Sequence, residues 1–221
     1  MSEKTPKVGT DLVGLGIIGV QLIQSGEKFL EKLVGPYLEE RGELWADRVR
    51  IKRQNLLTVA GLASQQIGDR SLHPVPGRVL FPTLEAAANE EDPTLQAMWA
   101  SLLAHAVTEP DSVLPAFPNI LRDLSPFEVK MLNSMCTLEH GEGPTRSLKT
   151  ESVSLEQMTA NFNSTPDQIL PLCANLYRLG LIMMTYNPGS LPQAAIEARF
   201  IHITIAPFGD AFIMACTSKS T

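Results

Sequence analysis

The residue types that could perform catalysis are scattered along this chain. The four histidines are His73, His105, His140 and His202, and the three cysteines are Cys136, Cys173 and Cys216. The histidines lack the short spacing of a metal site, and the cysteines lack a CxxC pair. No serine stands in the GxSxG pattern of a nucleophile elbow. We therefore predict no enzyme activity, metal or cofactor, and expect the cysteines to be buried free thiols on apolar helical faces in a reducing compartment.

One glycine pattern requires closer attention. Gly14, Gly16 and Gly19 match GxGxxG, the dinucleotide-binding fingerprint. That fingerprint functions when a buried strand leads into the glycine turn and a second strand completes a βαβ unit. No β-branched run precedes Gly14, and the residues that follow have a helical period. The pattern therefore predicts a glycine-bearing helix rather than a nucleotide site.

The elements that would position these residues begin with a helical hairpin. Apolar and small residues alternate at steps of three and four over 12–33, Gly35-Pro36 interrupts the pattern, and a second stripe runs over 45–63. Within the first stripe, Gly19 and Gly26 each cost about 1 kcal/mol relative to alanine in a helix interior. Their presence predicts a close contact between helices. Residues 1–70 are accordingly expected to form a hairpin that serves self-association or acts as an effector.

A basic cluster lies on the second stripe. It contains Arg48, Arg50, Lys52 and Arg53, and acidic residues precede it. A solvated helix face with neighbours of opposite sign is the simpler interpretation. Contact with a membrane surface or a phosphate is the alternative, so these arginines remain candidate interaction residues.

Bulk properties place the chain among globular proteins. Its 221 residues are 44% hydrophobic and 19% charged. A net charge of −6 and a pI near 5.3 provide no general attraction for nucleic acid phosphates. The longest apolar run, residues 12–23, is shorter than the roughly 18 to 20 residues of a spanning helix, and no secretion signal opens the chain. We expect a soluble, cytoplasmic protein.

The rest of the chain is predicted as two further parts. A linker over 69–78 marks the first boundary, and residues 71–122 would also contain a short helix over 80–89 and a helix opened by Asp92-Pro93. This last helix should bury one face that includes Trp99, with His105 beside it as a structural histidine. Residues 123–221 would form the third part.

This third part has the order of elements found in a winged helix. Ser125 and Glu128 predict a capping box that opens a helix reaching Leu138. Two more caps open helices over 155–162 and 165–179, strands follow over 181–186 and 199–205, and a closing helix spans 207–216. The predicted fold is mainly α: an N-terminal helical hairpin, an α-helical middle and a C-terminal winged-helix-like module with a small β-hairpin.

Whether the module reads DNA depends on its second capped helix. The predicted helix over 165–179, which would contact DNA, has few polar residues. The candidate interaction residues among them are Gln168, Asn175 and Arg178. Base readout needs such side chains together with phosphate contacts from lysine and arginine. The region from residue 122 onward is net acidic, so we expect DNA binding to be unlikely.

Four segments together resemble a known family: EEDPTLQAMWASLLAHAV, AFPNILRDLSPFEVKML, LYRLGLI and IAPFGDAFIMAC. They are similar to the Abi-alpha family, named for abortive infection in bacteria, over residues 75–216. Its signature positions in this chain are Trp99, Ser125, Glu128 and Gly209. The resemblance implies a role in defence against phage and transfers no catalytic or cofactor residue.

Three functional hypotheses follow. The leading one is a non-enzymatic phage-defence protein that forms a homo-oligomer and binds an unknown host or phage protein. The second is a membrane-acting effector that uses the glycine-rich N-terminal helix, for which a membrane surface is a possible partner. The third is a winged-helix transcriptional regulator, which the charge balance disfavours.

Overall fold

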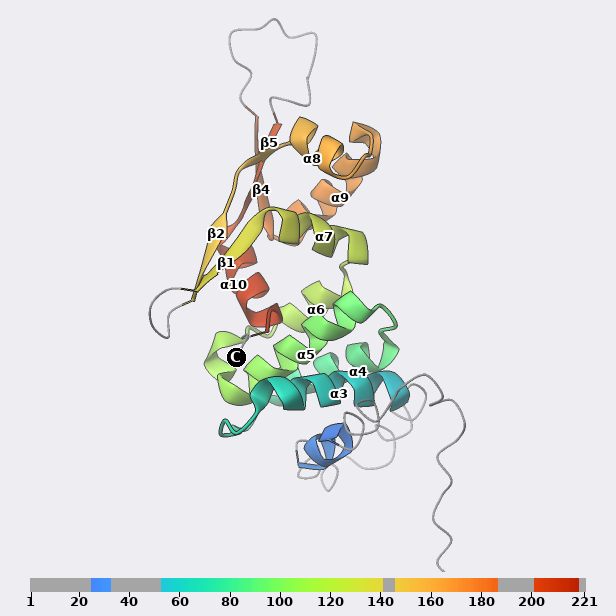
Figure 1. Ribbon diagram of the computed structural model, residues 1–221, viewed down its shortest axis with the longest axis vertical. Helices are drawn as coiled ribbons and strands as arrows, with labels where there is room; N and C mark the ends of the chain where they lie inside the picture. Colours follow the sequence, from blue (N-terminus) through green and yellow to red (C-terminus); the bar gives the residue numbers. More distant parts are fainter. Residues whose placement is uncertain (1–24, 33–52, 141–145, 187–200, 219–221) are drawn as a thin grey trace, which may run out of the picture.

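A computed structural model describes residues 25–32, 53–140, 146–186 and 201–218 of the chain (Figure 1). Residues 25–32 form a helical segment. The later elements are α3 (Arg53–Ile67), α4 (Gly77–Asn89), α5 (Pro93–Thr108), η2 (Pro110–Ser112), α6 (Phe117–Arg122), α7 (Pro126–Ser134), β1 (Cys136–His140), β2 (Arg146–Thr150), β3 (Val153–Ser154), α8 (Leu155–Asn161), α9 (Pro166–Arg178), β4 (Ile182–Tyr186), β5 (Ile201–Ile205) and α10 (Pro207–Cys216). The protein is mainly helical with a small antiparallel sheet, as predicted.

Helix α5 begins at the predicted position. The Asp92 carboxylate accepts the backbone N–H groups of Thr94 and Leu95 at 2.9 and 3.1 Å, and proline occupies the first helical position. These contacts satisfy donors that have no partner within the helix. Trp99 is 1% exposed, so the prediction of a buried face is confirmed there.

The burial of α5 extends further than one face. Ser101, Ala104 and His105 are also buried, because α3, α4, α6 and α10 pack around the helix from different sides. The prediction of a single apolar face was therefore too narrow. His105 is a structural histidine, as expected, since its Nδ1 lies 2.9 Å from the carbonyl oxygen of Ser101.

Helices α3, α4, α5 and α6 make up the lower part of the molecule in Figure 1, and α7, α8, α9 and the strands make up the upper part. Helix α10 lies between them and packs on α5. Its Phe212 ring meets that of Phe117 edge-on, with centroids 5.5 Å apart. One hydrophobic core therefore connects residues from both parts of the molecule.

The hairpin of β1 and β2 is a correction to the predicted elements. The helix that starts at Pro126 ends at Ser134, and Leu138, expected on that helix, lies in β1 opposite Leu148. Beside the paired residues, the Met135 carbonyl accepts the N–H of Glu151 at 2.9 Å. Because that N–H lies far along the chain, the bond directs the backbone into strand pairing rather than another helical turn.

The second sheet has the order β3-β5-β4, with both pairs antiparallel. Ile203 and Ile205 of β5 are buried on one side, as the alternation predicted, and Ile201 is partly buried. The order α7, α8, α9, β4, β5 is the one that suggested a winged helix, and the strands β1, β2 and β3 between α7 and α8 were not predicted. The winged-helix assignment itself stays a prediction, and its expected loop at 187–198 lies outside the described residues.

The predicted contact between N-terminal helices is confirmed at Gly26. A Cβ on this residue would lie 2.5 Å from the carbonyl oxygen of Leu57 and 2.9 Å from the amide nitrogen of Gly61. Only glycine permits this approach of the segment 25–32 to α3. Gly19 lies outside the described residues, as do Arg48 and Arg50.

The predicted domain boundaries at 70 and 122 stay predictions. Helix α3, before the first boundary, packs on α4 and α5, which follow it. Helix α4 begins at Gly77, inside the predicted linker, because the Pro76 carbonyl accepts the N–H groups of Val79 and Leu80.

Candidate interaction site on helix α9

The predicted signature at the start of α7 forms a complete capping box. The Glu128 carboxylate accepts both the backbone N–H and the hydroxyl of Ser125 at 2.7 Å through Oε2. In return, Ser125 Oγ accepts the Glu128 N–H at 3.3 Å. Each residue thus satisfies a backbone donor of the other, and this local pattern was visible in the sequence.

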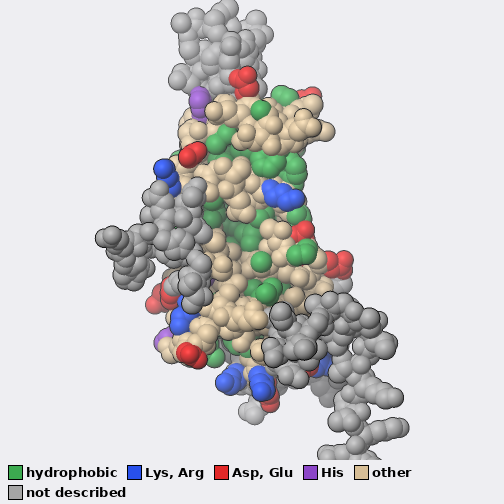
Figure 2. Space-filling model, viewed as in Figure 1, with side chains coloured by type: hydrophobic (Ala, Val, Ile, Leu, Met, Phe, Trp, Pro, Cys, Tyr) green, Lys and Arg blue, Asp and Glu red, His purple; other side chains and the backbone are tan. Residues whose placement is uncertain are grey.

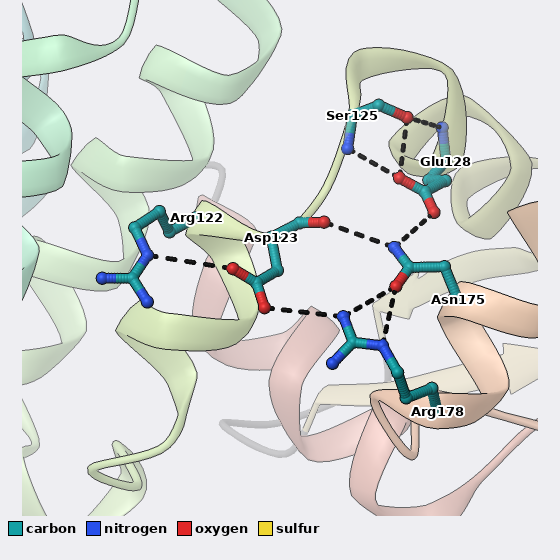
Figure 3. A network of polar contacts seen from close by, with 6 residues as sticks. All are labelled: Arg122, Asp123, Ser125, Glu128, Asn175 and Arg178. Atoms are coloured by element: carbon teal, nitrogen blue, oxygen red, sulfur yellow. Dashed lines mark hydrogen bonds and ion pairs between the residues drawn. The ribbon is translucent and has the colours of Figure 1, made fainter.

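Glu128 does more than cap its own helix. Its side chain is buried, and its second oxygen, Oε1, accepts a hydrogen bond from Asn175 Nδ2 of α9 at 2.7 Å (Figure 3). The same amide nitrogen lies 3.3 Å from the Asp123 carbonyl oxygen. A buried carboxylate needs such donors. The side chain of Asn175 therefore fixes α9 to the turn between α6 and α7.

Arg178 extends this arrangement to the surface. Its guanidinium donates to Asn175 Oδ1 at 3.1 Å through Nε and at 2.8 Å through a terminal nitrogen. The Asp123 carboxylate lies 3.5 Å from Arg178 and 3.8 Å from Arg122. These charged side chains are largely exposed, so their pairing contributes little stability beyond orienting the Asn175 amide.

We call these six residues the Asn175 network: Arg122, Asp123, Ser125, Glu128, Asn175 and Arg178 (Figure 3). It joins Asn175 and Arg178, which were predicted as interaction residues, to Ser125 and Glu128, which were predicted as signature residues of the family. Arg122 and Asp123 were missed as members, although Asp123 lies only two residues before Ser125. The network holds α7, α9 and the turn between α6 and α7 together.

Gln168 also makes an internal contact. Its Oε1 accepts the backbone N–H of Thr165 at 3.0 Å, at the start of α9. The predicted interaction residues of α9 therefore all bond within the chain. The outward face of the helix instead presents Pro171, Ala174 and Tyr177, and the tyrosine is 59% exposed.

Two remaining predicted residues have clear positions. Arg53 pairs with Glu27 at 2.8 Å, which joins α3 to the segment 25–32 on an exposed surface. Gly209 of α10 packs against the backbone of Leu181, where a Cβ would lie 2.8 Å from the Leu181 carbonyl carbon. Glycine at this position allows α10 to approach the start of β4 closely.

The three cysteines are free, and their pKa values reflect burial. Burial raises the pKa of Cys173 to about 11 and that of Cys216 further. Cys136 is only partly buried and begins β1, which corrects its predicted place on a helix. Its pKa is raised mainly by burial and secondarily by the nearby Asp210 carboxylate. A raised pKa disfavours the nucleophilic thiolate at all three cysteines.

The described ranges contain no group of three histidine, cysteine, aspartate or glutamate side chains placed to hold a metal ion. Within the same residues, none of the helices has the length and apolar character needed to cross a membrane.

Comparison of the chain with models of known protein families identifies its family. The model described as abortive infection alpha matches residues 47–216, which is most of the chain. The chain belongs to the abortive infection alpha family. The match confirms the predicted resemblance and extends it upstream over α3, while the Asn175 network lies wholly within it. No curated protein and no solved structure matches this abortive infection alpha chain.

Proposed function

We propose that this abortive infection alpha protein takes part in defence against phage by binding a protein partner through the outward face of α9, without catalysing a reaction. Family membership supports the defensive role. The orientation of the side chains on α9 supports the mode of action.

The observation that carries the proposal is the division of α9 into two faces. Asn175 and Arg178 bond to Glu128 and Asp123, so they are engaged within the protein. Tyr177 points outward and is 59% exposed. Exposed tyrosines supply large contact areas at low entropic cost and are enriched among residues that dominate protein interfaces.

The distribution of charge favours a protein partner over DNA. Lysine and arginine side chains lie mostly apart from one another on the face shown in Figure 2, with acidic side chains among them. The net charge of the chain is −6. A recognition helix whose arginine is paired internally, on a protein with this charge, lacks the phosphate contacts that produce DNA affinity.

The experiment is a phage challenge of bacteria that express the full chain or the Tyr177→Ala variant, scored by plaque number and host survival. Leu114→Ala is the matched control, since Leu114 is an exposed apolar residue 42% accessible outside α9. We expect the full chain and Leu114→Ala to reduce plaques and Tyr177→Ala to lose that protection. Equal protection by all three would refute the role of α9.

Self-association is the second part of the proposal and rests on the predicted N-terminal hairpin. The close approach of the segment 25–32 to α3 at Gly26 supports a compact helical pair at this end of the chain. Analytical ultracentrifugation of the full chain at micromolar concentration is the direct measurement. A mass equal to the monomer would remove this part while leaving the α9 proposal intact. We place the protein in the cytoplasm, for which its three free cysteines provide support.

A further inference from the structure

The outward face of α9 is arranged symmetrically about Ala174. Pro171 precedes this alanine by three positions and Tyr177 follows it by three, so the three side chains lie on one side of the helix. Pro171 and Ala174 are exposed, and Tyr177 is 59% exposed. None of the three carries a charge. The centre of this face is therefore a small residue with a rigid ring on each side.

Pro171 is an unusual residue at its position. It lies inside α9, where its ring takes the place of the N–H that would donate to the Asp167 carbonyl. Proline disfavours a helix interior more strongly than any other residue. Its ring is exposed and is not part of the hydrophobic core, so packing within the chain does not account for it. A contact with another molecule would.

A second copy of this face is complementary to the first. When two α9 helices cross antiparallel about a two-fold axis at Ala174, each Tyr177 ring meets Pro171 of the other copy. Aromatic rings are common binding surfaces for proline. The small alanine side chains at the axis let the two helices approach closely. A parallel pair would set Tyr177 against Tyr177 and leave both prolines without a ring.

The charges at the two ends of α9 favour the same orientation. Asp167 lies in the first turn and Arg178 in the last, so an antiparallel pair brings the acidic end of each helix to the basic end of the other. The Arg178 side chain is 61% exposed even though it pairs with Asp123 at 3.5 Å. Exposed charges of this kind add little affinity, so they bias the direction of pairing while the uncharged face supplies the contact.

We propose that α9 binds α9 of a second copy of this chain, antiparallel, with Ala174 at the two-fold axis. This inference rests on the proposed use of the same face as a protein-binding surface, and it names the partner. The contact is additional to the N-terminal hairpin. Because a contact along one helix is smaller than the standard interface of about 1,600 Å², the dimer should be weak, with a Kd on the order of tens of micromolar.

The first measurement is the mass of the full chain by analytical ultracentrifugation from about 5 to about 200 µM. We expect a monomer–dimer equilibrium whose Kd rises at least about tenfold in Tyr177→Ala, because truncating an aromatic anchor removes a large part of such a contact. Ala174→Glu should weaken the dimer as strongly, since it places two like charges at the axis. Ala97→Glu, the same change at an exposed position of α5, is the control and should leave the Kd unchanged.

Disulfide crosslinking then tests the orientation. The background is Cys136→Ser, in which the remaining native cysteines, Cys173 and Cys216, are buried. Ala174→Cys should link two copies under mild oxidation, because its two positions meet at the axis. Asp167→Cys, on the same helix, should not. Its two positions would lie about 21 Å apart along the helix axes, since each is seven residues from Ala174 and a helix rises about 1.5 Å per residue.

Three results would overturn the proposal: a chain that stays monomeric up to about 200 µM, a dimer that survives Ala174→Glu, or equal crosslinking of Ala174→Cys and Asp167→Cys. The phage challenge separates this proposal from the proposed function. Lost protection in Tyr177→Ala, with a parent chain that is monomeric, would leave α9 as a surface for a different protein. A dimer lost in Tyr177→Ala with protection intact would support the pairing and remove its role in defence.

Discussion

Asn175 Nδ2 and Glu128 Oε1 lie 2.7 Å apart although the two residues are separated by 47 positions in the chain. The contact joins the last turn of α9 to the first turn of α7, and one of its partners is a buried carboxylate. The capping box orients that carboxylate, so a local sequence signal also determines where a distant helix is held.

The first prediction concerns this contact. Asn175→Leu keeps the branching and the number of side-chain heavy atoms but removes the donor to the buried Glu128 carboxylate. Because a buried charge is left with fewer partners, we expect the free energy of unfolding to fall by about 2–3 kcal/mol. Urea denaturation measures the change. Asn133→Leu, on the exposed side of α7, is the control and should change it by about 0.5 kcal/mol or less. Equal losses in both variants would contradict the role of Asn175.

The second prediction compares two capping boxes. Ser125 and Ser154 both cap a helix, but only the Ser125 box contains a buried carboxylate. Ser125→Ala should lower the free energy of unfolding by about 2 kcal/mol and Ser154→Ala by about 1 kcal/mol or less. Denaturation of the two single variants in parallel tests the order. A larger loss for Ser154→Ala would show that the burial of Glu128 does not strengthen its cap.

The third prediction concerns the packing of α10. A Cβ on Gly209 would meet the backbone of Leu181, whereas a Cβ on Gly77 would meet only the Phe81 ring, at 3.0 Å. The backbone cannot move aside as a side chain can. Gly209→Ala should therefore destabilise the fold by about 2–3 kcal/mol, and Gly77→Ala by less than about 1 kcal/mol. Calorimetry of both variants provides the measurement, and similar melting temperatures would be evidence against this account.

The fourth prediction concerns the segment 25–32. Gly26→Ala places a Cβ against the backbone of Leu57 and Gly61, so it should release the segment from α3. Amide hydrogen exchange should then accelerate at 25–32 with little change in α5. Arg53→Gln removes an exposed ion pair to Glu27 and should leave exchange nearly unchanged. If Arg53→Gln releases the segment as strongly, the glycine contact is not what holds it.

The fifth prediction is a pH dependence. Burial raises the pKa of Cys173 from its ordinary value of 9.0 to about 11. The unfolded chain therefore loses this proton first as pH rises, so the stability that the neutral thiol contributes is present below pH 9 and is lost between pH 9 and about 11. Denaturation at pH 8 and 10.5 should show a smaller decrease for Cys173→Ala than for the parent. Equal decreases would exclude Cys173 as a source of the dependence.

The elements that could be predicted from the sequence are those with local chemical signals. Asp92 before Pro93, and Ser125 with Glu128, fixed helix starts because their hydrogen bonds span only two or three positions. The glycine approach at Gly26 was predicted from helical spacing and the known cost of glycine. The capping groups lie within a few residues of one another. Gly26 stands in a helical stripe of apolar and small residues, and this spacing marks it as a position where two helices pack.

The parts that could not be predicted depend on contacts between distant residues. The hairpin of β1 and β2 and the bond from the Glu151 N–H to the Met135 carbonyl join residues at least six positions apart, and nothing near Met135 in the sequence signals that pairing. Asn175 and Arg178 were predicted to contact a partner molecule. Their partner within the chain, Asp123, lies more than 50 positions away, so no local pattern in the sequence indicates the contact. A hollow of about 410 Å³ between α4, α5 and α6 likewise exists only after these three helices come together.

The position of α10 between the two parts of the molecule has a consequence for the order in which the chain folds during synthesis. Phe117 of α6 is enclosed by Phe208 and Phe212, which are made much later. Until residues 207–216 emerge from the ribosome, the apolar surfaces of α5 and α6 that they cover remain open to other proteins in the cell. The nascent chain therefore passes through a stage with native helices and an unfinished core, at which chaperones would bind and early termination would yield aggregates.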